Sequence, residues 1–189
     1  VQDLSQDSKL VDINGDVARI AASTIKNYAM LALFYEIKEG RIAYTPRIRI
    51  MVESMISYNR GLEHGNNSFN NLVNIIGMER INKILQQYGF SRTKVVELIP
   101  DNERTYKNTI SSNDLNLFYN LLWHNKLPYS SEMKRILAIK KADRLVDGTC
   151  IPEDIESYTK SGAVHGMVAD SGILVIKDSE GKDHPYAIT

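Results

Sequence analysis

The longest stretch without a turn residue covers residues 23–39 and is apolar on nearly all sides. Ile25, Ala29 and Leu33 follow one another at intervals of one helical turn, and Gly40 ends the pattern. Apolar residues at this spacing predict an α-helix. Because a helix that is apolar nearly all round belongs in the interior of a protein, we expect this helix to lie at the centre of the core.

Five further helices are predicted in the middle of the chain. Thr45 and Pro46 have the sequence of a helix start, because threonine caps the first turn and proline lacks the N–H that would stay unpaired there. Ser111 with Asp114 is typical of a capping box, and Ser130 is expected to cap the last helix. The predicted segments are 46–56, 70–76, 78–88, 111–122 and 130–137.

Strand patterns occupy the two ends of the chain. Residues 1–13 are expected to form a two-stranded hairpin closed at Asn14-Gly15. Later strands are predicted at 156–160, 172–176 and 186–188, with a turn at 178–181. This order predicts an α+β fold, in which an antiparallel sheet is flanked by helices and carries an inserted all-helical lobe. The expected division is residues 1–22 and 146–189 for the sheet lobe and residues 23–145 for the helical lobe.

Composition limits the class of function. The 189 residues are 43% apolar, which is enough for a packed core. The chain has 23 basic and 23 acidic residues, so it lacks the basic surface that binding to nucleic acid requires. Cys150 is the only cysteine, which rules out an internal disulfide. The longest apolar run, Tyr28 to Tyr35, is too short to span a membrane.

A serine followed three residues later by a lysine occurs five times, and only the context of Ser23 and Lys26 indicates chemistry. At the start of the predicted buried helix, Lys26 lies one turn after Ser23 on the same face. A lysine amine can accept the proton of a serine hydroxyl and so activate it as a nucleophile. The alternative is that Ser23 only caps the helix while Lys26 reaches solvent.

A second candidate group is Lys160, Ser161 and Gly162, which stands between a predicted strand and the apolar run 172–176. A lysine on an edge strand can face a cleft, and glycine allows a substrate to approach the backbone closely. The simple alternative is a charged strand end followed by a turn. Neither a glycine-rich phosphate loop nor a GxSxG motif is present. We predict no metal, because zinc-ligand spacing is absent from the histidines, which are His64, His124, His165 and His184.

Four motifs in order along the chain carry a resemblance to a known family. They are the segment 21–26 (AASTIK), the triplet 64–66 (HGN) followed by Asn70 and Gly77, the segment 103–108 (ERTYKN) and the triplet 160–162 (KSG). Together they resemble the penicillin-recognising serine hydrolases, closest to the class A β-lactamase-like branch. The resemblance spans nearly the whole chain and implies the β-lactamase/transpeptidase-like fold.

What this resemblance implies for function is an acyl-enzyme mechanism without a cofactor, acting on β-lactams or D-alanyl-D-alanine-type peptides. It implies a small-molecule or peptide substrate as partner and a periplasmic or secreted location, and it leaves the oligomeric state open. Ser23 is then the nucleophile, Lys26 the proton acceptor, and Lys160 and Ser161 hold the substrate carboxylate. The other implied substrate-binding residues are Asn66, Gly162 and Ala163, of which Ala163 shares the oxyanion hole with the Ser23 amide.

The second motif of this family is Ser-x-Asn, and the chain offers two registers for it. The register that ends at Asn66 puts His64 where the family has serine, and an imidazole can transfer the proton to the leaving nitrogen. The alternative, Ser57 with Asn59, fits the motif but stands several residues earlier. We expect His64 to fill this position.

The chain departs from the family in two further ways. Glu97 is the nearest candidate for the glutamate that activates the deacylating water, but its offset from Ile99-Pro100 differs, which predicts a long-lived acyl-enzyme. Counterparts of the first helix and of the last strand and helix of the family are also not evident. These departures leave open an alternative function, a non-catalytic ligand-binding or sensing module that retains the fold.

Overall fold

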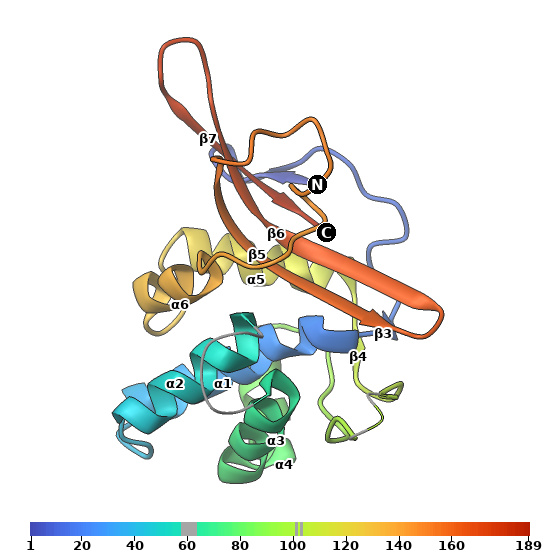
Figure 1. Cartoon of the computed structure of the whole chain (residues 1–189), viewed down its shortest axis with the longest axis vertical. Helices are drawn as coiled ribbons and strands as arrows, with labels where there is room; N and C mark the ends of the chain where they lie inside the picture. The colour runs from blue at the N-terminus through green and yellow to red at the C-terminus, as the bar shows by residue number, and fades with distance from the viewer. Residues whose placement is uncertain (58–63, 101, 103) are drawn as a thin grey trace.

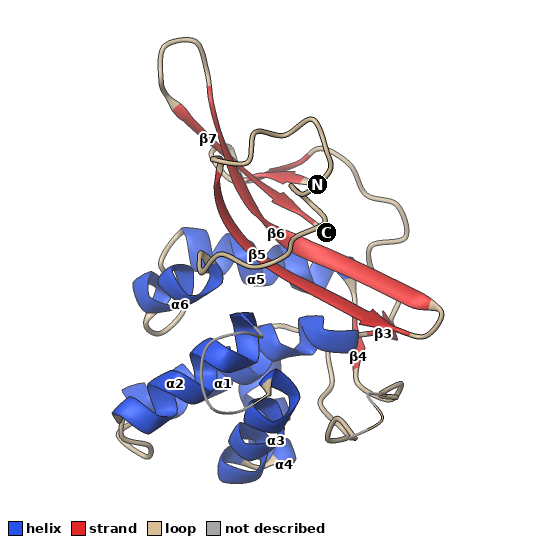
Figure 2. Ribbon diagram, viewed as in Figure 1, coloured by secondary structure: helices blue, strands red, loops and turns tan. Residues whose placement is uncertain are grey.

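The computed structural model describes residues 1–57, 64–100, 102 and 104–189, and Asn59 and Glu103 lie outside the described residues. Strands gather in one layer and most helices in another, with α5 beside the sheet (Figures 1 and 2). This arrangement confirms the predicted α+β fold. The described helices are η1 (Ala22–Ile25, 3₁₀), α1 (Lys26–Lys38), α2 (Pro46–Ser57), α3 (Gly65–Ile76), α4 (Met78–Gln87), α5 (Ser112–Trp123) and α6 (Ser130–Leu137).

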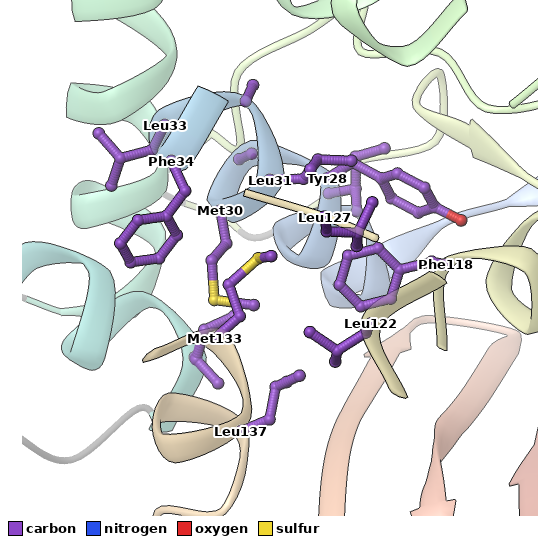
Figure 3. Close-up of a cluster of buried hydrophobic side chains, with 14 of the residues drawn as sticks. Tyr28, Met30, Leu31, Leu33, Phe34, Phe118, Leu122, Leu127, Met133 and Leu137 are labelled. Atoms are coloured by element: carbon purple, nitrogen blue, oxygen red, sulfur yellow. The ribbon is translucent and has the colours of Figure 1, made fainter. Parts of the chain in front are cut away.

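Helix α1 forms the centre of the core, as its apolar pattern predicts. Its contacts are with α2, α3 and α4, while α5 and α6 pack against the sheet. Figure 3 shows Met30 of α1 next to Met133 of α6, within a buried cluster that also contains Phe34 and Leu137. Burial of apolar side chains from several helices around α1 stabilises this layer and fixes the orientation of the turn that precedes the helix.

The main sheet has five strands in the order β2-β1-β7-β6-β5, and every pairing in it is antiparallel. β5 is therefore an edge strand, and β1 and β2 continue the sheet beyond β7. A separate pair joins β3 to β4. The strands are β1 (Gln2–Asp3), β2 (Ser8–Lys9), β3 (Arg19–Ile20), β4 (Thr109–Ile110), β5 (Glu156–Val164), β6 (Met167–Lys177) and β7 (Asp183–Ile188).

The predicted N-terminal hairpin closes at a different turn from the one we expected. β1 pairs with β2 across residues 4–7, because Asp3 Oδ1 accepts hydrogen bonds from the Ser5 and Gln6 amides at 2.8 and 3.2 Å. An aspartate side chain that accepts hydrogen bonds from the amides two and three residues later favours a turn at that point, so the strand ends there. Asn14 does lie in a turn, with φ 55°, but the chain then leaves the sheet and forms β3.

Several strand and helix boundaries and one cap also differ from the prediction. β5 continues through Val164 and turns at Gly166 (φ 84°), so the triplet 160–162 lies inside a strand. α3 begins at Gly65 rather than at residue 70, because the polar first turn lacks the apolar spacing used to predict it. Ser130 does not cap α6: Tyr129 is the residue before the helix, and Ser130 Oγ donates to the Leu127 carbonyl at 2.8 Å.

Candidate active site

The turn η1 carries the candidate nucleophile at the start of α1. Ser23 is 7% exposed, and its neighbour Ala22 has φ 44°, a left-handed conformation that costs an alanine roughly 1–2 kcal/mol. The Ala21 amide donates to the Asn108 carbonyl at 2.9 Å, which ties the turn to the segment before β4. Strain of this kind persists only where the surrounding structure fixes it, and it occurs frequently at functional sites.

Lys26 lies one turn after Ser23 and is fully buried. Its Nζ donates a hydrogen bond to Asn66 Oδ1 at 2.7 Å, so the first turns of α1 and α3 are joined. The approach of α3 is close: a Cβ placed on Gly65 would lie 2.8 Å from the Ser54 carbonyl oxygen and 3.6 Å from Lys26 Nζ. The alternative in which Lys26 reaches solvent is therefore wrong.

Gly162 brings the edge strand against the same turn. A Cβ at this position would lie 2.7 Å from the Ser23 amide nitrogen and 3.1 Å from the Thr24 nitrogen. Only glycine fits at this position without displacing the backbone. β5 therefore runs directly past η1, which lies below the sheet in Figure 1. Lys160 lies two residues earlier on the same strand face and is 2% exposed, with its Nζ bonded to the Ser161 carbonyl at 2.5 Å.

Ser161 and Ala163 alternate with these residues along β5. Ser161 is half-buried and lies opposite Asp170 of β6, whereas Ala163 is exposed and lies opposite Val168. The structure thus brings Ser23, Lys26 and Asn66 together with the strand that carries residues 160–163.

His64 and Ser57 differ in what their side chains contact. His64 is exposed, precedes α3, and accepts a long hydrogen bond from the Asn66 amide at its Nδ1 (3.4 Å). Ser57 is buried in the last turn of α2, where its hydroxyl donates to the Glu53 carbonyl at 2.8 Å. Asn66, which ends the first register, thus reaches Lys26, whereas Ser57 of the alternative register bonds within its own helix.

Glu97 is half-buried and anchors its own loop. Its Oε1 accepts hydrogen bonds from Thr105 Oγ1 and from the amides of Tyr106 and Lys107 at 2.6–2.8 Å. Burial alone would raise the pKa of Glu97, but the bonds from Lys107, Thr105 and Tyr106 outweigh it and lower the pKa. This carboxylate is held in its charged form as a loop support.

Neither a metal-binding cluster nor a membrane-spanning helix is found in the parts of the chain that the structure describes. No cluster of three or more histidine, cysteine, aspartate or glutamate side chains there could hold a metal ion. Within the same residues, no helix combines the length and the apolar character needed to cross a membrane.

The sequence profile described as "Beta-lactamase enzyme family" matches residues 1–65 and 63–187, which is nearly the whole chain. The chain belongs to the β-lactamase enzyme family. It is thus a member of the penicillin-recognising serine hydrolases, close to class A, as the four motifs indicate. No curated protein sequence matches it.

Solved structures of β-lactamases and of a penicillin-binding protein share the fold of this β-lactamase family member. A β-lactamase from Sphaerobacter thermophilus is 20% identical, with 86% of this chain and 71% of that chain covered and a TM-score of 0.70. PBP-A is also 20% identical, with 94% and 74% covered and a TM-score of 0.74. The TLA-1 extended-spectrum β-lactamase is 13% identical, with 98% and 79% covered and a TM-score of 0.78.

Two residues near the edge strand of this β-lactamase family member have no sequence signal, because they lie in the irregular segment between α6 and β5. Arg144 donates to the Gly162 carbonyl at 3.0 Å and forms an ion pair with Asp170 at 2.9 Å. Lys141 donates to the carbonyls of Leu137 and Ile139 at the end of α6, and burial lowers its pKa to about 8. Both place positive charge beside β5.

The buried position of Lys160 and the charges around it lower the pKa of its amine. Burial is the largest cause that lowers its pKa to about 7, and the positive charge of Lys141 lowers it further. Asp170 and Asp143 oppose this effect, whereas Arg144 adds to it. The pKa of the Lys160 amine is therefore shifted from its ordinary value towards neutral pH.

We expect Lys160→Met to raise the stability of the protein at pH 7 and below, on the order of a few kcal/mol. The folded pKa of about 7 lies below the ordinary value of 10.5, so the unfolded chain binds more protons between these values. Stability of the wild type consequently rises with pH across that window, and the advantage of the methionine variant shrinks. Urea unfolding at several pH values measures this difference.

The control for this prediction is Lys38→Met, at the exposed end of α1, which should change stability by less than about 0.5 kcal/mol. A Lys160→Met variant that is less stable than the wild type at pH 6 contradicts the prediction.

Proposed function

We propose that the protein is a serine hydrolase acylated at Ser23 by β-lactams or by D-alanyl-D-alanine-type peptides. The observation that carries this proposal is the meeting of two contacts at one turn of the chain. Gly162 lies against the Ser23 amide, and Lys26, one turn later, is bonded to Asn66. Membership of the β-lactamase enzyme family supports the same chemistry.

In the acylation step, Ser23 Oγ forms a bond to the carbonyl carbon of the substrate, and the bond from that carbon to nitrogen breaks. The hydroxyl proton passes to the neutral amine of Lys26. We assign delivery of a proton to the leaving nitrogen to His64, whose ring lies at the start of α3. The amides of Ser23 and Ala163 stabilise the negative charge that develops on the carbonyl oxygen.

The carboxylate of the substrate needs positive charge next to the edge strand. Lys160 and Ser161 are the proposed contacts, and the guanidinium of Arg144, which is paired with Asp170, lies beside β5 at the Gly162 carbonyl. A carboxylate bound there places the neighbouring carbonyl carbon over η1, because Gly162 contacts that turn. Positioning of this kind contributes a large part of catalysis in such reactions.

Deacylation is proposed to be slow. It requires a base that activates water at the ester, and the carboxylate of Glu97 is already engaged by Thr105 and by two backbone amides. Without another base the acyl-enzyme persists, and the protein acts more as a β-lactam acceptor than as an efficient β-lactamase.

The test is the intact mass of the folded protein after incubation with penicillin G. This probe is chosen because a mutant of PBP-A, 20% identical with a TM-score of 0.74, is described as an acyl-enzyme complex with penicillin G. We expect one penicilloyl group per chain, which remains attached after free penicillin is removed. Ser23→Ala is expected to abolish the adduct completely.

Absence of an adduct on folded wild-type protein with several β-lactams would reject the proposal for this substrate class. Reversible binding that Ser23→Ala does not weaken would identify a non-catalytic binding module instead. Two further variants distinguish the registers of the second motif. His64→Ala should slow adduct formation by about tenfold to a hundredfold, whereas Ser57→Ala should leave the rate unchanged.

A further inference from the structure

A buried line of polar side chains connects helix α1 to the edge strand behind the active site. Asn27 follows Lys26 on α1, Tyr119 lies on α5, and Ser171 on β6 stands directly opposite Lys160 of β5. Asn27, Tyr119 and Ser171 each have no exposed surface. Polar groups that are buried to this extent need partners inside the protein.

The hydrogen bonds of this line all run in one direction. Asn27 Nδ2 donates to the Tyr119 hydroxyl at 3.1 Å. That hydroxyl lies 3.1 Å from both the carbonyl oxygen and Oγ of Ser171, and Ser171 Oγ donates to the Lys160 carbonyl at 3.2 Å. Since the Ser171 proton is used on Lys160, the single proton of Tyr119 is the one shared with Ser171.

The surroundings of Tyr119 make its hydroxyl a fixed and neutral donor. The ring packs edge-to-face on Phe118, with centroids 5.2 Å apart. Burial raises the pKa of Tyr119, so the phenol keeps its proton at physiological pH. A phenylalanine would preserve the ring but leave the Asn27 amide without this acceptor, and a buried donor without a partner favours rearrangement or entry of water.

We propose that Tyr119 is a positioning residue for the active site, which holds β5 at a fixed distance from α1 through Asn27 and Ser171. Lys26 directly precedes Asn27, and the Lys160 carbonyl is the last acceptor in the line. The phenol hydroxyl thus joins the two lysine-bearing elements from behind. An effect of Tyr119 on acylation rests on the proposed function, whereas its effect on the position of β5 does not.

The experiment compares Tyr119→Phe with the matched control Tyr28→Phe. Tyr28 is equally buried and its ring contacts Phe118, but its hydroxyl has no hydrogen-bond partner among the described residues and so lies outside this line. The first readout is the pKa of the Lys160 amine, followed by NMR in protein with ¹³Cε-labelled lysine. We expect a wild-type value of about 7. The pKa should rise by about half a pH unit or more in Tyr119→Phe, because water gains access to the strand, and stay constant in Tyr28→Phe.

The second readout is the second-order rate constant of acylation by penicillin G, which should fall about tenfold in Tyr119→Phe. Tyr28→Phe should acylate at the wild-type rate. If the wild type forms no adduct, the proposed function fails, and the Lys160 titration alone decides the positioning role.

A Tyr119→Phe variant that keeps both the Lys160 titration and the wild-type acylation rate overturns the proposal. Should Tyr119→Phe not fold, Ser171→Ala replaces it. That variant removes the donor to the Lys160 carbonyl but keeps the Ser171 carbonyl as an acceptor for Tyr119. The same direction of change in the Lys160 pKa is then expected, and an unchanged value is equally decisive against the proposal.

Discussion

Replacement of Lys26 by methionine is expected to lower the rate of acylation by penicillin G about a thousandfold or more. Methionine has a similar volume, so the packing of α1 is retained while the proton acceptor is lost. The Nζ of Lys26 also donates a hydrogen bond to Asn66 Oδ1 at 2.7 Å. The methionine side chain has no amine that could replace it in either role. Stopped-flow or quenched mass measurements of adduct formation provide the rate.

Lys38→Met is the matched control, since it makes the same change at the exposed end of the same helix. It should acylate at the wild-type rate. Acylation of Lys26→Met at a rate within a few-fold of the wild type would show that another group accepts the Ser23 proton.

The second large effect is expected from Gly162→Val. The added Cβ would lie 2.7 Å from the Ser23 nitrogen, and the contact is with backbone that cannot rotate away. β5 must therefore move from η1, which we expect to lower the acylation rate by about a hundredfold or more and stability by about 1–3 kcal/mol. Gly162→Ala should show the same changes to a smaller extent.

Loss of stability alone has to be separated from displacement of the strand. Ile84→Ala on α4 serves this purpose, because it removes a fully buried side chain far along the helical layer and costs about 2–5 kcal/mol. The folded fraction of this variant should acylate normally. If Gly162→Val acylated as fast as the wild type, the close contact between β5 and η1 would have no catalytic role.

Local patterns predicted the elements whose signals are contained within a few residues. The apolar repeat through Ile25, Ala29 and Leu33 identified the central helix, and Ser111 does accept a hydrogen bond from the Asp114 amide as a cap should. The pattern failed where tertiary contacts decide. β3 and β4 are two residues each and pair across about ninety positions of sequence, so neither has a signal of its own.

The candidate site was predictable to a similar degree. The spacing of Ser23 and Lys26 predicted that they share one helix face, and the resemblance to penicillin-recognising enzymes supplied Asn66, which accepts a hydrogen bond from Lys26. The charges of Lys141 and Arg144 were missed, because their position beside β5 depends on the path of an irregular segment. Tyr119 was hidden for another reason: a tyrosine within an apolar helix pattern is indistinguishable from an ordinary core residue.

The pairing of β1 with β7 bears on how the protein is made. Gln2 lies opposite Ala187, so the two partners are separated by 185 positions and β1 is made well before β7. The helices between them have mostly local contacts and can pack first, while β1 waits for β7 before it has a neighbour other than β2. Completion of the sheet is therefore the slow, late event, because β1 can join it only after β7 has been made.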